Sequence, residues 1–113
     1  MMLDYEKLDV YGCSLQFLAT ALRLTMRMPR GYAYLGDQLR RAATSIPLNI
    51  AEGTGKVSPS DRARFHVIAR GSAMECGALV DVVRILGLAN ESEEREAKVL
   101  VIRIVSMLSK MCR

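Results

Sequence analysis

The chain has 113 residues, half of them apolar, so we expect one domain covering residues 1–113 around a single hydrophobic core. Only six residues are Phe or Tyr and none is Trp, so that core must be aliphatic, a composition that favours helices. The formal net charge is +4, and the sequence shows neither a run of the ~20 apolar residues that a membrane span requires nor a secretory signal, which predicts a soluble cytoplasmic protein with reduced cysteines.

The first predicted helix covers about residues 5–28 and ends at the breaker Pro29-Arg30-Gly31. It carries two apolar stripes at helical spacing, of which one must face the core. The second stripe indicates that another face is also covered, by a second copy of the chain. The stripes are Leu8, Tyr11, Leu15, Leu18, Leu22 and Thr25, and Val10, Cys13, Phe17, Ala21, Leu24 and Met28.

The second predicted helix covers about residues 32–52 and ends at Gly53-Thr54-Gly55. Pro47 lies inside it, removes one backbone donor and frees the carbonyl of Ala43, so we expect a kink there. Ser45 and Asn49 are nearby polar groups that can satisfy the disturbed turn. The inward residues should be Leu35, Leu39, Ala42, Ala43, Ile46 and Ile50.

The third predicted helix begins with Ser58 as N-cap and Pro59 at the first helical position, and it ends at Gly87. Its small residues Ala69, Ala73 and Gly77, four apart, let another helix approach closely. Its inward stripe should be Phe65, Ile68, Ala69, Ser72, Cys76, Leu79, Val83 and Leu86.

The fourth predicted helix begins at Asn90, with Glu93 three residues on in a capping-box-like pattern. It is apolar nearly all round, so its outer faces should also be covered. Four helices of about 20 residues with short connections predict an all-α, antiparallel up-down-up-down bundle that forms a homo-oligomer. Its inward stripe should be Ala97, Leu100, Ile104, Leu108 and Met111.

Positive charge is concentrated in the middle of the chain. Residues 23–70 contain nine basic and three acidic residues, a net +6, whereas the remainder has seven basic and nine acidic residues, a net −2. Arginine stripes at helical spacing can neutralise phosphates without reading sequence, and the alternative is a solvated face with ordinary salt bridges such as Asp37 with Arg41. The candidate nucleic-acid-binding residues are Arg23, Arg27, Arg30, Arg40, Arg41, Lys56, Arg62, Arg64 and Arg70.

A second set of polar residues lies near predicted apolar faces, and we expect a buried structural network with Arg41 or Arg70. The only histidine, His66, shares a stripe with Arg62 and Arg70 and is expected at the surface. No catalytic residue, metal site or cofactor is predicted, because neither a Glu-x-x-His pair nor a Cys-x-x-Cys occurs. The network candidates are Asn49, Glu52, Ser72 and Glu75.

Two blocks carry a family resemblance, QLRRAATSIPLNIAEG at residues 38–53 and IARGSAME at residues 68–75. They resemble the bacterial four-helix-bundle proteins called 23S rRNA intervening-sequence proteins, whose relatives include the accessory protein of diversity-generating retroelements. The resemblance implies a barrel-like pentamer with a basic surface, RNA or DNA as ligand, and a reverse transcriptase or other protein as partner. Arg40, Arg41, Asn49, Glu52, Arg70, Ser72 and Glu75 fall on the family motif.

The sequence therefore favours a non-enzymatic oligomer that binds nucleic acid, or a nucleoprotein partner, through arginines of the first three helices. The alternative is an accessory module that docks protein partners on the apolar faces of the first and last helices, with arginines that only maintain solubility. An enzyme of the cofactor-binding bundle type is the least favoured hypothesis.

Overall fold

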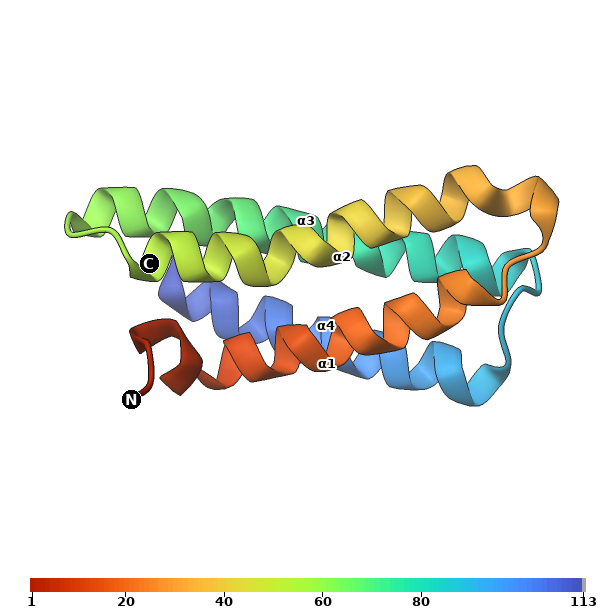
Figure 1. Cartoon of the computed structure of the whole chain (residues 1–113), viewed down its shortest axis with the longest axis horizontal. Coiled ribbons are helices and arrows are strands. Elements are labelled where there is room, and N and C mark those ends of the chain that lie inside the picture. The colour runs from red at the N-terminus through yellow and green to blue at the C-terminus, as the bar shows by residue number, and fades with distance from the viewer. Residues whose placement is uncertain (113) are drawn as a thin grey trace.

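A computed structural model describes residues 1–112 and contains four long helices (Figure 1). They are α1 (Asp9–Met26), α2 (Ala33–Thr54), α3 (Pro59–Ile85) and α4 (Glu91–Met111), with short 3-10 helices η1 (Asp4–Lys7) and η2 (Arg30–Tyr32). Figure 1 shows the α1–α2 and α3–α4 connections at one end of the long axis and the α2–α3 connection at the other. The all-helical, four-helix architecture predicted from the sequence is confirmed, and Pro47 lies inside the uninterrupted α2.

Three helix boundaries follow from local chemistry that the sequence displays. The Ser58 hydroxyl accepts a hydrogen bond from the backbone of Asp61, with Pro59 in the first helical position, as predicted. Asn90 and Glu93 form the predicted capping box, in which each side chain bonds the other's backbone N–H. Gly87, with φ of +69°, ends α3 in a Schellman motif, since Leu88 N–H bonds the Val83 carbonyl.

The first predicted helix was wrong at both ends. Leu8 is extended and separates η1 from α1, which begins at Asp9 rather than near Tyr5. The break lets the Tyr5 ring pack on Tyr11, with centroids 4.8 Å apart. At the other end α1 stops at Met26 rather than Met28, because a residue directly before a proline disfavours helical backbone.

The core lies between the four helices and is aliphatic, as predicted. On α1 the second stripe is the buried one, centred on the fully buried Phe17, whereas Leu15 and Leu22 of the first stripe are exposed. On α2 all six predicted inward residues are buried. On α4 the buried residues include Ala97, Leu100, Ile104 and Leu108.

The inward stripe predicted for α3 was partly wrong. Ile68 and Leu86 are exposed, and Val80 is buried although it was not predicted to be. The small residues Ala69, Ala73 and Gly77 are buried, and α4 comes close at Gly77, where a Cβ would lie 3.3 Å from the Val101 side chain. The close packing of α3 on α4 therefore fixes which face of α3 points inward.

Candidate nucleic-acid interface

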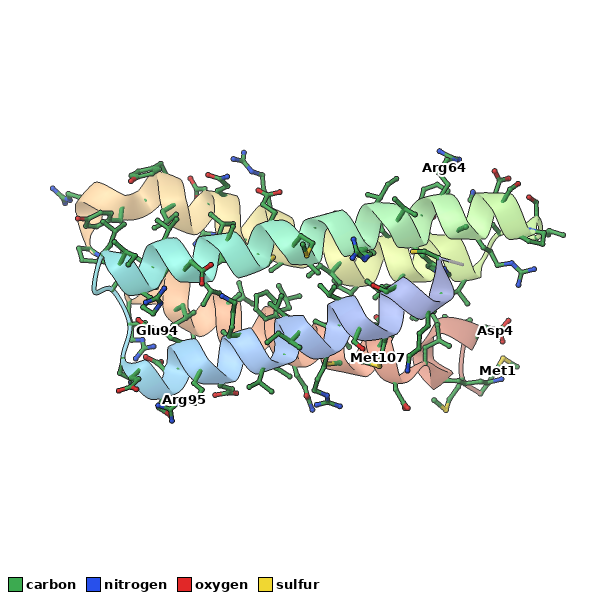
Figure 2. All side chains as sticks on the ribbon, turned by 180° about the vertical axis from the view of Figure 1, so that it is seen from behind. Met1, Asp4, Arg64, Glu94, Arg95 and Met107 are labelled. Atoms are coloured by element: carbon green, nitrogen blue, oxygen red, sulfur yellow. The ribbon has the colours of Figure 1, made fainter. Side chains whose placement is uncertain are left out.

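The nine predicted basic residues are spread along the whole bundle. Arg23, Arg27 and Arg30 lie near the end where α1 meets α2, whereas Lys56, Arg62 and Arg64 lie near the α2–α3 connection at the opposite end. In Figure 2 Arg64 lies at the end that holds Met1 and Asp4, opposite the end that holds Glu94 and Arg95 of α4. The remaining three, Arg40, Arg41 and Arg70, lie along the middle of α2 and α3.

Five of these nine cations have a carboxylate partner. Arg27 pairs with Glu93 and Arg40 with Asp37. The predicted Asp37–Arg41 pair is therefore replaced by a contact three residues apart, which leaves Arg41 without a carboxylate partner among residues 1–112. The other three pairs are Arg23–Glu96 at 3.7 Å, Lys56–Glu52 at 3.4 Å and Arg64–Asp61 at 4.0 Å.

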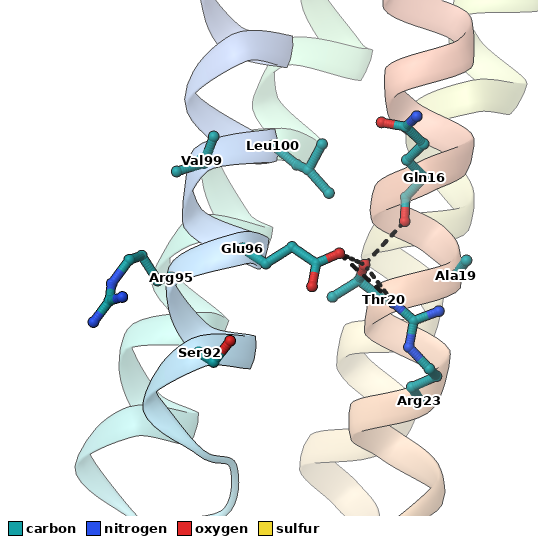
Figure 3. Close-up of a pocket in the computed structure, with 9 residues that line it drawn as sticks. All are labelled: Gln16, Ala19, Thr20, Arg23, Ser92, Arg95, Glu96, Val99 and Leu100. Atoms are coloured by element: carbon teal, nitrogen blue, oxygen red, sulfur yellow. Dashed lines mark hydrogen bonds and ion pairs between the residues drawn. The ribbon is translucent and has the colours of Figure 1, made fainter.

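Arg23 lies in a groove between α1 and α4 (Figure 3). Its guanidinium donates to the Thr20 hydroxyl at 3.1 Å, and that hydroxyl lies 3.4 Å from the Glu96 carboxylate. These contacts join the two helices and compensate the charge of Arg23 locally. The groove is thus a salt-bridged seam with little free positive charge.

The other four of the nine candidates have no carboxylate partner within the part of the chain that the structure describes: Arg30, Arg41, Arg62 and Arg70. Arg62 donates to the carbonyl of Val57 at 2.9 Å, and Arg70 donates to the Ser109 hydroxyl at 2.8 Å. Neutral acceptors orient a guanidinium without cancelling its charge. Three of the four therefore leave positive charge available to an anionic ligand: Arg41 on α2, and Arg62 and Arg70 on α3.

The predicted polar network is divided into separate contacts. Asn49 donates to the Ser45 hydroxyl at 2.9 Å, and the Ser72 hydroxyl of α3 donates to the same oxygen at 2.9 Å. Glu52 instead pairs with Lys56 at the surface, and Glu75 accepts from the Gln38 amide at 3.3 Å. Neither Arg41 nor Arg70 bonds to these groups. The prediction of a single network that includes an arginine was therefore wrong.

Between α2 and α3 lies a hollow of about 390 Å³, lined in part by Ser45, Ser72 and Glu75. A second hollow of about 440 Å³ on the outer face of α2 adjoins it and shares Arg41 and Ser45. We call the first hollow the α2–α3 notch. Its lining residues are Gln38, Arg41, Ala42, Ser45, Ser72 and Glu75.

His66 is buried, with 5% of its surface exposed, which corrects the prediction of a surface histidine. The imidazole packs against Gly53 of α2, where the missing side chain leaves room for the ring. Its Nε2 has no hydrogen-bond partner among the described residues. Burial lowers the pKa of His66, the positive charge of Arg62 lowers it further, and a hydrogen bond to the backbone of Ile50 opposes both.

The cysteines Cys13 and Cys76 are buried and unpaired, as predicted, and Cys112 is half-buried. Burial, with a smaller contribution from the Glu75 carboxylate, raises the pKa of the Cys76 thiol to about 12. Burial also raises the pKa of Cys13. Both buried thiols are therefore protonated and unreactive at neutral pH.

The sequence reasoning placed Ser45 only at the disturbed turn near Pro47, and it missed two other residues that shape the notch and its surroundings, Gln38 and Tyr34. Ser45 accepts both hydrogen bonds of the polar cluster, and Gln38 holds Glu75 across the α2–α3 contact. Tyr34 carries an exposed ring one helical turn before Gln38. The spacing of Tyr34, Gln38 and Arg41, at i, i+4 and i+7 on one helix, is the signal that identifies this face.

No described helix is both long enough and apolar enough to cross a membrane. Within residues 1–112, no three potential ligands from His, Cys, Asp and Glu lie together in a group that could hold a metal ion. The fold and the surface together define a small helical bundle whose polar face lies between its two middle helices.

The chain matches the family model described as "23S rRNA-intervening sequence protein" over residues 6–110, and it belongs to that family. The match includes both sequence blocks of the resemblance and extends over all four helices. A comparison with curated proteins finds no match to the chain.

Proposed function

We propose that this protein is a non-enzymatic, homo-oligomeric accessory protein that binds RNA through the arginines of α2 and α3. In this proposal the bundle is antiparallel, with α2 bent at Pro47, and it works in the cytoplasm of a bacterium. The family name supports an RNA-related role. The observation that carries the proposal is that Arg41, Arg62 and Arg70 have no carboxylate partner among the described residues.

The physical argument is one of charge. Residues 23–70 carry a net +6, and each uncompensated guanidinium can replace a counterion on a phosphate. Because one chain spreads its cations over both ends and the middle, a ring of subunits would join them into a continuous basic band. We propose that this ring is a pentamer. The protein would bind and position RNA without making or breaking covalent bonds.

The test is fluorescence anisotropy of labelled single-stranded RNA and duplex DNA at several salt concentrations. We expect the logarithm of the association constant to fall with log salt, by about 0.7 per phosphate contact on a single strand and about 0.9 on a duplex. The variants Arg41→Gln and Arg62→Gln should each reduce the slope by about one contact. Arg95→Gln on α4, whose guanidinium already pairs with Glu91, is the matched control. Absence of binding at low salt would reject the proposal.

A second candidate function, a protein-interaction module without RNA binding, is favoured by a different observation. Leu15 and Leu22 on α1 are 42% and 39% exposed, and Val99 and Ile102 on α4 are 50% and 60% exposed. Such residues suit a protein partner, for example a reverse transcriptase. In that case the arginine variants would leave partner binding unchanged, whereas a charge at Ile102 would abolish it.

A further inference from the structure

The α2–α3 notch keeps two opposite charges apart. Arg41 and Glu75 both line it, yet they form no ion pair within 4.0 Å. The carboxylate of Glu75 is held by the Gln38 amide at 3.3 Å instead. A bare phosphate in the notch would be repelled by Glu75, and a bare cation by Arg41. The ligand that fits must carry an anionic group for Arg41 and a hydrogen-bond donor for Glu75.

The remaining lining of the notch is small and polar. The Ser45 hydroxyl accepts from both Asn49 and Ser72, and these contacts hold the polar wall of the notch in place. Ala42 leaves space beside Arg41. A flexible segment of a ligand can therefore enter without displacing a structural hydrogen bond.

An aromatic ring stands next to the notch on the same face of α2. Tyr34 is 63% exposed, and it lies four residues before Gln38 and seven before Arg41. Seven residues of helix rise roughly 10 Å, a distance comparable to one or two nucleotides of a single strand. Exposed aromatic rings stack on the bases of single-stranded nucleic acid.

We propose that the α2–α3 notch selects RNA over DNA: Tyr34 stacks on a base, Arg41 binds the adjoining phosphate, and Glu75 accepts a hydrogen bond from the ribose 2′-hydroxyl. DNA supplies the base and the phosphate but lacks that hydroxyl donor. This inference rests on the proposed function, because it names the ligand class that the basic surface takes.

The decisive variant is Glu75→Gln, because simple electrostatics and the proposal predict opposite results. Removal of one negative charge from a basic surface should strengthen binding to RNA and DNA alike. Loss of the 2′-hydroxyl acceptor should weaken binding to RNA only. Glu91→Gln, an exposed acid on α4 that pairs with Arg95, removes the same charge away from the notch and is the matched control.

The experiment measures anisotropy of labelled oligouridylate and oligodeoxyuridylate of twelve nucleotides at one fixed salt concentration. We expect the unmodified protein to bind the RNA about tenfold more tightly, the size of one charge-assisted hydrogen bond. Glu75→Gln should lose that preference through weaker RNA binding, whereas Glu91→Gln should keep it. Tyr34→Leu should weaken both ligands about tenfold and leave the preference intact.

Two results would overturn the inference while leaving the proposed function standing. One is equal binding of the two oligonucleotides by the unmodified protein. The other is a preference for RNA that persists in Glu75→Gln. If neither oligonucleotide binds even at low salt, the proposed function itself fails, and the inference fails with it.

Discussion

At the scale of single residues, the contact between His66 and Gly53 is the tightest packing that a glycine makes in the described chain. A Cβ on Gly53 would lie 2.8 Å from Nε2 of His66, 2.9 Å from its Cδ2 and 3.0 Å from the backbone oxygen of Arg62. Because one of these atoms is backbone and the ring is enclosed, α2 and α3 would have to move apart to accommodate a methyl group.

We therefore expect Gly53→Ala to lower the free energy of unfolding by about 1–3 kcal/mol, although alanine favours helix more than glycine does. Gly71→Ala is the control, because Gly71 lies within α3 and its added Cβ meets nothing within 4 Å. That variant should gain up to about 1 kcal/mol. Urea denaturation measures both changes, and a stabilised Gly53→Ala would contradict the tight contact.

The same histidine gives the protein a pH dependence of stability. Burial lowers the pKa of His66 from its ordinary value of 6.5, so the unfolded chain binds more protons than the folded chain below that pH. Stability should therefore fall as pH drops below about 6.5, and this loss should cease once pH is below the pKa of the folded state.

The variant His66→Asn removes the titration while it keeps an amide N–H for the Ile50 backbone. As pH falls from 7 to the folded-state pKa of His66, the free energy of unfolding of the unmodified protein should fall relative to that of the variant. Denaturation series across this range provide the measurement. Parallel curves would show that His66 titrates normally in the folded protein.

These residue-scale features were the least accessible to sequence reasoning. The spacing of Arg62, His66 and Arg70 suggested one exposed stripe, yet His66 is buried because Gly53, thirteen positions earlier and on another helix, leaves space for its ring. Helical periodicity marks the faces of one helix but does not say which small residue of a neighbouring helix will lie opposite.

At the scale of elements, helix ends carry the clearest local chemistry. Asn90 caps α4 by accepting from the Glu93 N–H at 2.8 Å, while the Glu93 carboxylate accepts from the Asn90 N–H at 3.3 Å. These contacts satisfy donors that the first turn of a helix otherwise leaves unpaired. They lie at the end of the bundle where Arg27 also pairs with Glu93.

Asn90→Ala should cost about 1 kcal/mol of stability, because the capping acceptor is lost while the backbone donors remain. Ser92→Ala, two residues into the same region of α4, removes a polar group that caps nothing and should change stability by less than about 0.5 kcal/mol. Thermal and urea unfolding would compare the two. Equal losses in both variants would mean that the cap contributes nothing specific.

The elements themselves could be predicted well because their signals are local. Ser58 and Asn90 set boundaries through side-chain caps, Pro59 and Gly87 do so through their backbone preferences, and these boundaries were found where expected. The start of α1 could not be predicted, since Leu8 adopts its extended conformation where its side chain packs against the core. Similarly, Asn49, Ser45 and Ser72 meet only because α2 and α3 pack together.

At the scale of the whole molecule, the four helices bury one face each and leave apolar residues outside. Exposed aliphatic side chains occur on all four helices, and four of them, Leu15, Leu22, Val99 and Ile102, lie on α1 and α4, which pack against each other. A charged residue among such side chains would disfavour their burial by a second copy of the chain.

We expect the protein to be a homo-oligomer and Ile102→Glu to dissociate it, which light scattering at micromolar concentration would measure as a fall to the mass of one chain. Ser60→Glu is the control, because it adds the same charge at an exposed position in the first turn of α3, where an acid is favourable. If the basic band needs several subunits, the dissociated variant should also lose most of its salt-dependent RNA binding. It should do so although it retains Arg41, Arg62 and Arg70. A monomeric unmodified protein would reject the oligomer, and RNA binding that survives dissociation would place the whole interface within one chain.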